Sequence, residues 1–99
     1  MSDDIRVFKT LSGEDIISEV SKVEETHYVL KNPSVLVLQE TESGVRVGLA
    51  PFMPYAKGSI ALYASSVMAE AAPDDSMVDE YKRIFSPIVV PQSSIITAR

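Results

Sequence analysis

The first 23 residues carry a pattern of apolar positions that predicts two strands joined by a tight turn. Residues 5–11 are rich in β-branched and aromatic side chains, and residues 12–14 supply a turn whose glycine can take a positive φ. Apolar positions resume over about residues 15–23, which predicts the second strand. Because Ile16 and Ile17 are adjacent, we expect one of them to be partly covered from the second face, as in a strongly curved barrel.

The middle of the chain predicts a third strand, an interruption and a return strand. Residues 28–30 begin the third strand, and we expect Asn32-Pro33 to bend or interrupt it because proline cannot donate to a ladder. Residues 35–38 resume as an apolar run that we expect to be covered on both sides. A turn at residues 41–44 and the alternation over residues 45–49 predict the return strand.

The last third of the chain predicts an irregular loop followed by short strands. The loop covers residues 51–58, and the two strands lie near residues 59–64 and 66–71. Two prolines bracket the apolar residues of the tail, so residues 87–99 are expected to be extended, as an edge strand or an arm.

One amphipathic helix is expected over residues 74–85. Asp74 or Ser76 can cap its N-terminus, and its acidic residues precede Lys82 and Arg83 in the order that suits the helix dipole. An apolar stripe at helical spacing is more typical of a lid on a barrel end than of a ligand site. The stripe consists of Met77, Val78, Tyr81, Ile84 and Phe85.

The length and composition fit a single globular domain. The chain has 99 residues, of which 45% are hydrophobic and 23% charged, and it contains no cysteine. About five short, strongly bent strands with one helix favour a small barrel of the SH3, OB or Sm kind. We therefore expect one domain over residues 1–99, with the barrel at about 5–71.

The charge and the hydropathy of the chain limit its partners and its location. The net charge of −5 argues against broad electrostatic capture of nucleic acid, which needs clustered Lys and Arg. The acidic start lacks the features of a signal peptide, and no apolar run approaches membrane-spanning length. We expect a cytoplasmic protein without membrane contact, whose binding of nucleic acid would have to be local and based on stacking.

Residue patterns for catalysis or metal binding are absent from the sequence. There is no Gly-x-Ser-x-Gly elbow, no phosphate-binding glycine loop, and no cysteine or histidine pair for a metal. The adjacent acids Glu24-Glu25 would point to opposite faces of a strand, and helix capping explains Asp74-Asp75. We expect no enzymatic activity, no cofactor and no metal site.

Three segments resemble the motifs of Sm proteins. Residues 7–20 resemble the first Sm motif, with an apolar strand, a glycine turn and a second apolar strand. Residues 25–29 can be aligned with the last part of the same motif. Residues 62–67 lie similarly on the second motif, which is usually apolar-Arg-Gly. Tyr63-Ala64 replaces that Arg-Gly, and Val29 stands where the family has its base-reading asparagine. The chain as a whole looks like the divergent Sm-like proteins of marine phages, of the cyanophage type.

The resemblance implies a mostly β, Sm-like (SH3-type) barrel with a C-terminal helix, and a site for single-stranded nucleic acid. On the motif, His27 takes the loop position whose ring stacks on a base, and Tyr63 lies in the facing loop. Tyr28 and Ser65 join this expected binding set, and Lys57 belongs to a second candidate patch that it forms with Tyr55 and Gly58. For each of these, a solvated, packing or local backbone role is the alternative, and for Tyr63 it is packing at a subunit interface.

A ring is the expected assembly. Between Val47 and Ala69 the only formally charged residue is Lys57. A strand edge without such charges tends to form backbone hydrogen bonds with another strand. In Sm proteins the last two strands pair between subunits, which gives an expected interface of Ile60, Leu62, Val67 and Met68. A head-to-tail contact of this kind closes into a homo-oligomer, here on the order of five to seven copies. Alternatively, residues 51–55 or the tail cover the edge within one chain.

These observations lead to two hypotheses about function. The first is a ring that binds single-stranded RNA, or DNA, through the His27 and Tyr63 loops around its pore. The second is a structural or protein-interaction module of a phage that uses the same ring without nucleic acid, which the net acidity favours. The departures at Val29, Tyr63 and Ala64 argue against uridine-specific reading by the family's usual residues.

Overall fold

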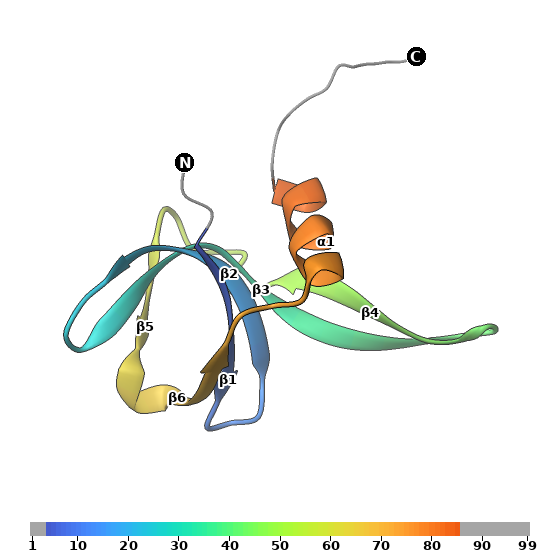
Figure 1. Cartoon of the computed structure of the whole chain (residues 1–99), viewed down its shortest axis with the longest axis horizontal. Coiled ribbons are helices and arrows are strands. Elements are labelled where there is room, and N and C mark those ends of the chain that lie inside the picture. The colour runs from blue at the N-terminus through green and yellow to red at the C-terminus, as the bar shows by residue number, and fades with distance from the viewer. Residues whose placement is uncertain (1–3, 86–99) are drawn as a thin grey trace, which may run out of the picture.

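One antiparallel sheet of six strands and one helix make up the fold (Figure 1). The computed structural model describes residues 4–85 of the chain. The expectation of a mostly β domain followed by a helix is confirmed, and the expected tail at residues 87–99 lies outside the described residues. The elements are β1 (Ile5–Thr10), β2 (Asp15–Val23), β3 (His27–Thr41), β4 (Gly44–Pro51), β5 (Ile60–Tyr63), the 3₁₀ turn η1 (Ala64–Ser66), β6 (Val67–Ala71) and α1 (Asp75–Phe85).

The long strand β3 organises the sheet. The strand order is β4-β3-β2-β1-β6, and β5 pairs with β3 outside this path. The first residues of β3 pair with β2 and β5, whereas its second half pairs with β4. The turn η1 carries the chain from β5 on β3 to β6 on β1, so the sheet bends back on itself (Figure 1). Over residues 4–85 no ladder joins β5 to β6, and a closed barrel is not found.

A bulge replaces the interruption that was expected in β3. The strand runs through, with one more residue between Lys31 and Ser34 than β2 has opposite them. Asn32 takes the left-handed conformation at φ 55°, and Pro33 lies where the bulge already disrupts the ladder. The Ser18 hydroxyl, 3.1 Å from the Lys31 carbonyl oxygen, can donate to it and so occupies an acceptor at the bulge.

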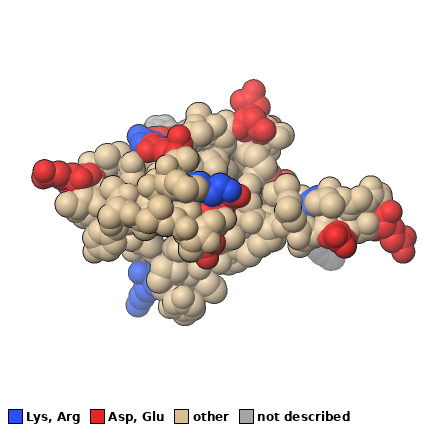
Figure 2. Space-filling model, turned by 90° about the horizontal axis from the view of Figure 1, so that it is seen from below, with Lys and Arg blue, Asp and Glu red and all other residues tan. Residues whose placement is uncertain are grey.

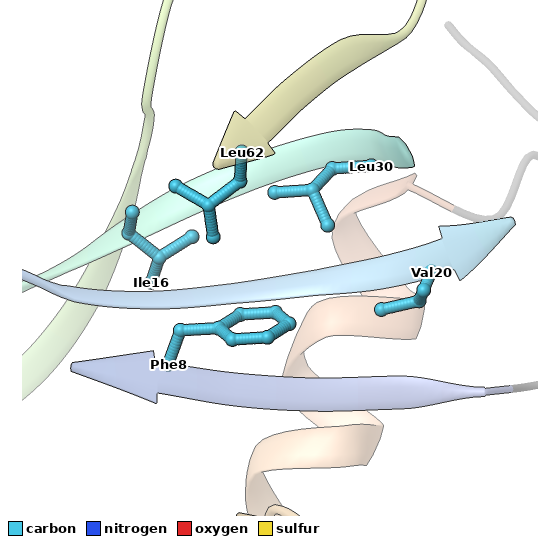
Figure 3. Packing of buried hydrophobic residues seen from close by; sticks show 5 residues of the cluster. All are labelled: Phe8, Ile16, Val20, Leu30 and Leu62. Carbon is cyan, nitrogen blue, oxygen red and sulfur yellow. The ribbon is translucent and has the colours of Figure 1, made fainter. Parts of the chain in front are cut away.

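The core lies inside the bend of the sheet. Figure 3 shows its five clustered side chains, which come from β1, β2, β3 and β5: Phe8, Ile16, Val20, Leu30 and Leu62. Ile16 and its neighbour Ile17 are both fully buried, which confirms that β2 is covered on both faces. The bend places Leu62 of β5 opposite the side chains of β1 and β2.

Helix α1 begins at the predicted cap. Asp74 Oδ1 accepts hydrogen bonds from the Met77 amide and the Ser76 hydroxyl, both at 2.9 Å. These bonds stabilise the carboxylate and hold the pKa of Asp74 below its ordinary value, the Met77 amide contributing most. The expected apolar stripe is only partly covered, since Tyr81 is buried but Ile84 is 43% exposed.

Tyr81 fastens α1 to the bulge of β3. Its hydroxyl oxygen accepts a hydrogen bond from the Glu19 amide at 3.0 Å. Its proton lies within reach of the carbonyl oxygens of Lys31 (2.8 Å) and Asn32 (2.9 Å). Burial of the ring raises the pKa of Tyr81. The helix is therefore held by a residue that satisfies backbone groups at the point where the ladder is irregular.

The apolar run at residues 35–38 is less covered than expected. Val35 is half-buried, but Leu38 is 74% exposed. The physical reason is that the outer part of the β3–β4 hairpin extends beyond the rest of the sheet, so that little packs against it (Figure 1). Among the described helices, none is long and apolar enough to cross a membrane.

Candidate nucleic-acid interface

His27 and Tyr63 lie side by side across paired strands. They are register partners at the start of β3 and the end of β5, and their ring centroids are 5.6 Å apart with an interplanar angle of 56°. Tyr63 is 58% exposed and His27 is half-buried. Sequence reasoning placed the two residues in facing loops, whereas the structure places them at strand ends on one face of the sheet.

Backbone contacts around this pair fix its position. The Ala64 amide donates to the Thr26 carbonyl at 2.9 Å, which ties the turn before β3 to η1. The Ser66 hydroxyl donates to the Tyr63 carbonyl at 2.8 Å. His27 Nδ1 lies 3.0 Å from the Thr26 hydroxyl oxygen, which orients the imidazole ring. The two rings are thus held on ordered backbone, where they can offer aromatic faces for stacking.

Tyr28 belongs to the opposite face of β3. Its register partner is Leu62 of the core, and its ring centroid lies 4.9 Å from that of Phe8. Its hydroxyl donates to Glu70 Oε1 at 2.8 Å, and this hydrogen bond is the main cause of the raised pKa of Tyr28. The structure therefore gives Tyr28 a packing role within the chain and does not bring it to His27 and Tyr63.

A charged network that the sequence pattern did not reveal joins β1 to β6. Arg6 Nη1 donates to Glu70 Oε2 at 2.5 Å, and Arg6 Nε donates to Asp4 Oδ1 at 3.0 Å. Asp4 and Glu70 raise the pKa of Arg6 above its ordinary value. Glu70 accepts from Tyr28 as well, so its carboxylate is already used by partners within the chain. Arg6 and Glu70 are far apart in sequence, and only the pairing of β6 with β1 brings them together.

Ser65 and Lys57 were also predicted to bind nucleic acid. Ser65 is exposed in η1, two residues after Tyr63, and it therefore borders the pair. Lys57 is exposed in the loop between β4 and β5, whose neighbouring residues Ala56 and Gly58 line a different feature, a cavity of about 260 Å³. The structure shows no contact that joins Lys57 to the aromatic pair.

The residues expected at a subunit interface differ in exposure. Leu62 is 6% exposed and packs in the core of its own chain. Ile60 and Val67 are half-buried, and Met68 is 61% exposed on β6. The bend of the sheet explains the burial of Leu62, because it turns that face of β5 towards β1 and β2. β6 pairs with β1 alone, so its outer edge is unpaired within the part of the chain that the structure describes.

Charged side chains are sparse on one face of the molecule. In the view of Figure 2 the face is mostly uncharged, with Asp and Glu gathered at its margins and few Lys or Arg. No cluster of three or more His, Asp or Glu side chains suited to a metal is found between residues 4 and 85. This distribution does not suit a protein that holds nucleic acid by phosphate contacts alone.

Comparison with known proteins adds nothing to the geometry. No protein-family model matches the chain, and a search of the curated proteins finds no similar sequence. Function therefore has to be argued from the site.

Proposed function

We propose that this chain is an Sm-like protein of the marine-phage type, which assembles into a ring and binds single-stranded RNA or DNA by stacking bases on His27 and Tyr63. The observation that carries the proposal is the pairing of these two rings across β3 and β5, with Tyr63 exposed. A base stacked on an aromatic ring contributes about 1–3 kcal/mol.

The course of the chain supports a small Sm-like barrel. The segment that resembles the first Sm motif covers most of β1, the glycine turn and most of β2. The segment that resembles the second motif covers the end of β5, η1 and the start of β6. Pairing of β5 with the start of β3, and of β6 with β1, is the arrangement that such a strongly bent sheet needs. Contact between β5 of one copy and β6 of the next would satisfy both free edges.

Assembly is what makes the pair useful in this proposal. A single stacking site is weak, and the net charge of −5 offers little general attraction for phosphates. A ring repeats the site in each copy, and the linked sites raise the effective concentration of the next base once one is bound. The affinity should therefore depend on strand length more than on salt.

Fluorescence titration with short oligo-U, oligo-A and matched DNA at two salt concentrations tests this function. We expect binding at low salt that His27→Ala and Tyr63→Ala each weaken by about 1–3 kcal/mol, or at least about fivefold. Ile84→Ala is the control, because this side chain is 43% exposed on α1, outside the expected binding set.

The alternative function is a protein-interaction or structural module that uses the same ring. Acidic balance favours it, as do Val29 and Tyr63-Ala64 in place of the family's asparagine and Arg-Gly. The titration decides between the two functions. Absence of binding at low salt, or binding that neither His27→Ala nor Tyr63→Ala changes, would overturn the nucleic-acid proposal and leave this module.

A further inference from the structure

The outer part of the β3–β4 hairpin exposes an apolar face. Leu38 is the register partner of Val47, and Glu40 is the partner of Val45, so these four side chains share one side of the ribbon. Leu38, Val45 and Val47, here named the hairpin face, are 74%, 64% and 42% exposed. Because a two-stranded ribbon is marginally stable by itself, an uncovered apolar face on it indicates an interaction surface.

The tip of this hairpin is acidic. Glu40 and Glu42 are exposed, and neither makes an ion pair with any residue between 4 and 85. The hairpin carries one base, Arg46, which is the register partner of Gln39 and so lies on the side opposite the hairpin face. A surface that covers the hairpin face should therefore be apolar with a basic margin.

The base of the same hairpin offers such a surface. A cavity of about 260 Å³, here named the base cavity, lies between the start of the hairpin, the loop after it and the end of α1. Its apolar lining includes Pro33, Pro51, Met53, Ile60 and Phe85.

Two exposed lysines adjoin lining residues of the base cavity along the chain, although neither lines the cavity itself. Lys31 precedes the lining residue Asn32, and Lys57 lies between the lining residues Ala56 and Gly58. Both are exposed and without an ion-pair partner in the described part of the chain. The cavity therefore combines apolar lining residues with two lysines next to its lining in the chain, which the hairpin face and its acidic tip would match.

We propose that the hairpin face of one copy packs against the base cavity of the next copy, with Glu40 and Glu42 beside Lys31 and Lys57. The hairpin cannot fill the cavity of its own chain, because it begins there at Pro51 and its tip lies about 20 Å away along the strand. The contact is head-to-tail, as in a ring. It rests on the proposed assembly and adds a second contact between neighbours to the pairing of strand edges.

Zero-length carbodiimide cross-linking tests the contact directly. Unlabelled and ¹⁵N-labelled full-length chains are mixed, allowed to exchange and cross-linked, and the linked peptides are identified by mass spectrometry. We expect isotopically mixed links between Glu40 or Glu42 and Lys31 or Lys57. Mixed links elsewhere on the chain without any of these would overturn the contact and leave the assembly standing.

Charge reversal tests the same contact in solution. Glu42→Lys and Lys57→Glu should each raise the dissociation constant of assembly about tenfold in sedimentation velocity, and the double variant should recover most of the loss. Asp79→Lys on α1 makes the same charge change as Glu42→Lys at an exposed position and should have no effect. Circular dichroism checks that every variant is folded.

The outcomes separate this contact from the proposed function. If Glu42→Lys, Lys57→Glu and Leu38→Asp all assemble as the unaltered chain does, the hairpin contact is wrong, whereas the ring and its stacking site are unaffected. If assembly is weakened without recovery in the double variant, the charges do not face one another and the proposal is overturned.

Discussion

At the scale of single residues, much of the structure depends on polar side chains that form hydrogen bonds with backbone groups where the strand pairing is irregular. The Tyr81 hydroxyl contacts the Glu19 amide and the carbonyl oxygens of Lys31 and Asn32, all at the bulge of β3. The apolar stripe of the helix predicted that Tyr81 would be buried, and it is. Its hydroxyl partners could not be predicted, because they depend on where the extra residue of β3 falls.

Tyr81→Phe should therefore destabilise the domain while keeping its fold. The ring can still pack and the Ser18 hydroxyl still donates to the Lys31 carbonyl, but the Glu19 amide loses its acceptor and the Asn32 carbonyl loses its donor, which costs about 1–3 kcal/mol. Urea unfolding followed by circular dichroism measures the loss. Tyr55→Phe is the control, since its ring is 82% exposed. Equal stability of Tyr81→Phe and the unaltered chain would show that water replaces the hydroxyl without cost.

The charged network around Glu70 shows the same limit of sequence reasoning. Nothing in the spacing of Arg6, Tyr28 and Glu70 marks them as partners, because the signal is in the register of β6 against β1. The same network holds Tyr28 within the chain, although the Sm motif had placed it in the expected binding set. A one-residue step along β3 moves a side chain to the opposite face, so His27 and Tyr28 have different roles.

At the scale of elements, local patterns were sufficient to place most strands and the helix. The turn at Gly13, the alternation in β4 and the cap at Asp74 depend on neighbouring residues alone, and the structure confirms each of them. At Asn32-Pro33 the strand is not interrupted, but the ladder is disrupted by a bulge, which bends a strand while letting it continue past a proline. Exposure of the hairpin could not be predicted, since periodicity identifies a face but not what covers it.

Asn32 offers a test of the bulge. At φ 55° an asparagine is tolerated but a β-branched residue is strained, so Asn32→Val should destabilise the chain by about 1–2 kcal/mol. Asn32→Gly meets no such strain and should stay within about 0.5 kcal/mol of the unaltered chain. Chemical denaturation of the two variants side by side gives the difference. Equal stabilities would contradict the left-handed bulge.

At the scale of the whole molecule, the bend of one sheet creates both the core and the candidate site. It brings Leu62 over the side chains of β1 and β2 and, on the other face of the same strand, sets Tyr63 beside His27. Periodicity predicted neither contact. The resemblance to Sm proteins led us to expect the contact between His27 and Tyr63, because it aligned each residue with one of two motifs that face one another.

In the proposed assembly, the chain forms a ring in which each copy contributes one stacking site. Native mass spectrometry of the full-length chain with a short oligo-U tests it most directly. We expect one dominant closed species of about five to seven copies, with one strand bound per ring. His27→Ala with Tyr63→Ala should keep the ring mass and lose the strand. A monomer at micromolar concentration, or a ring that the oligonucleotide never joins, would contradict it.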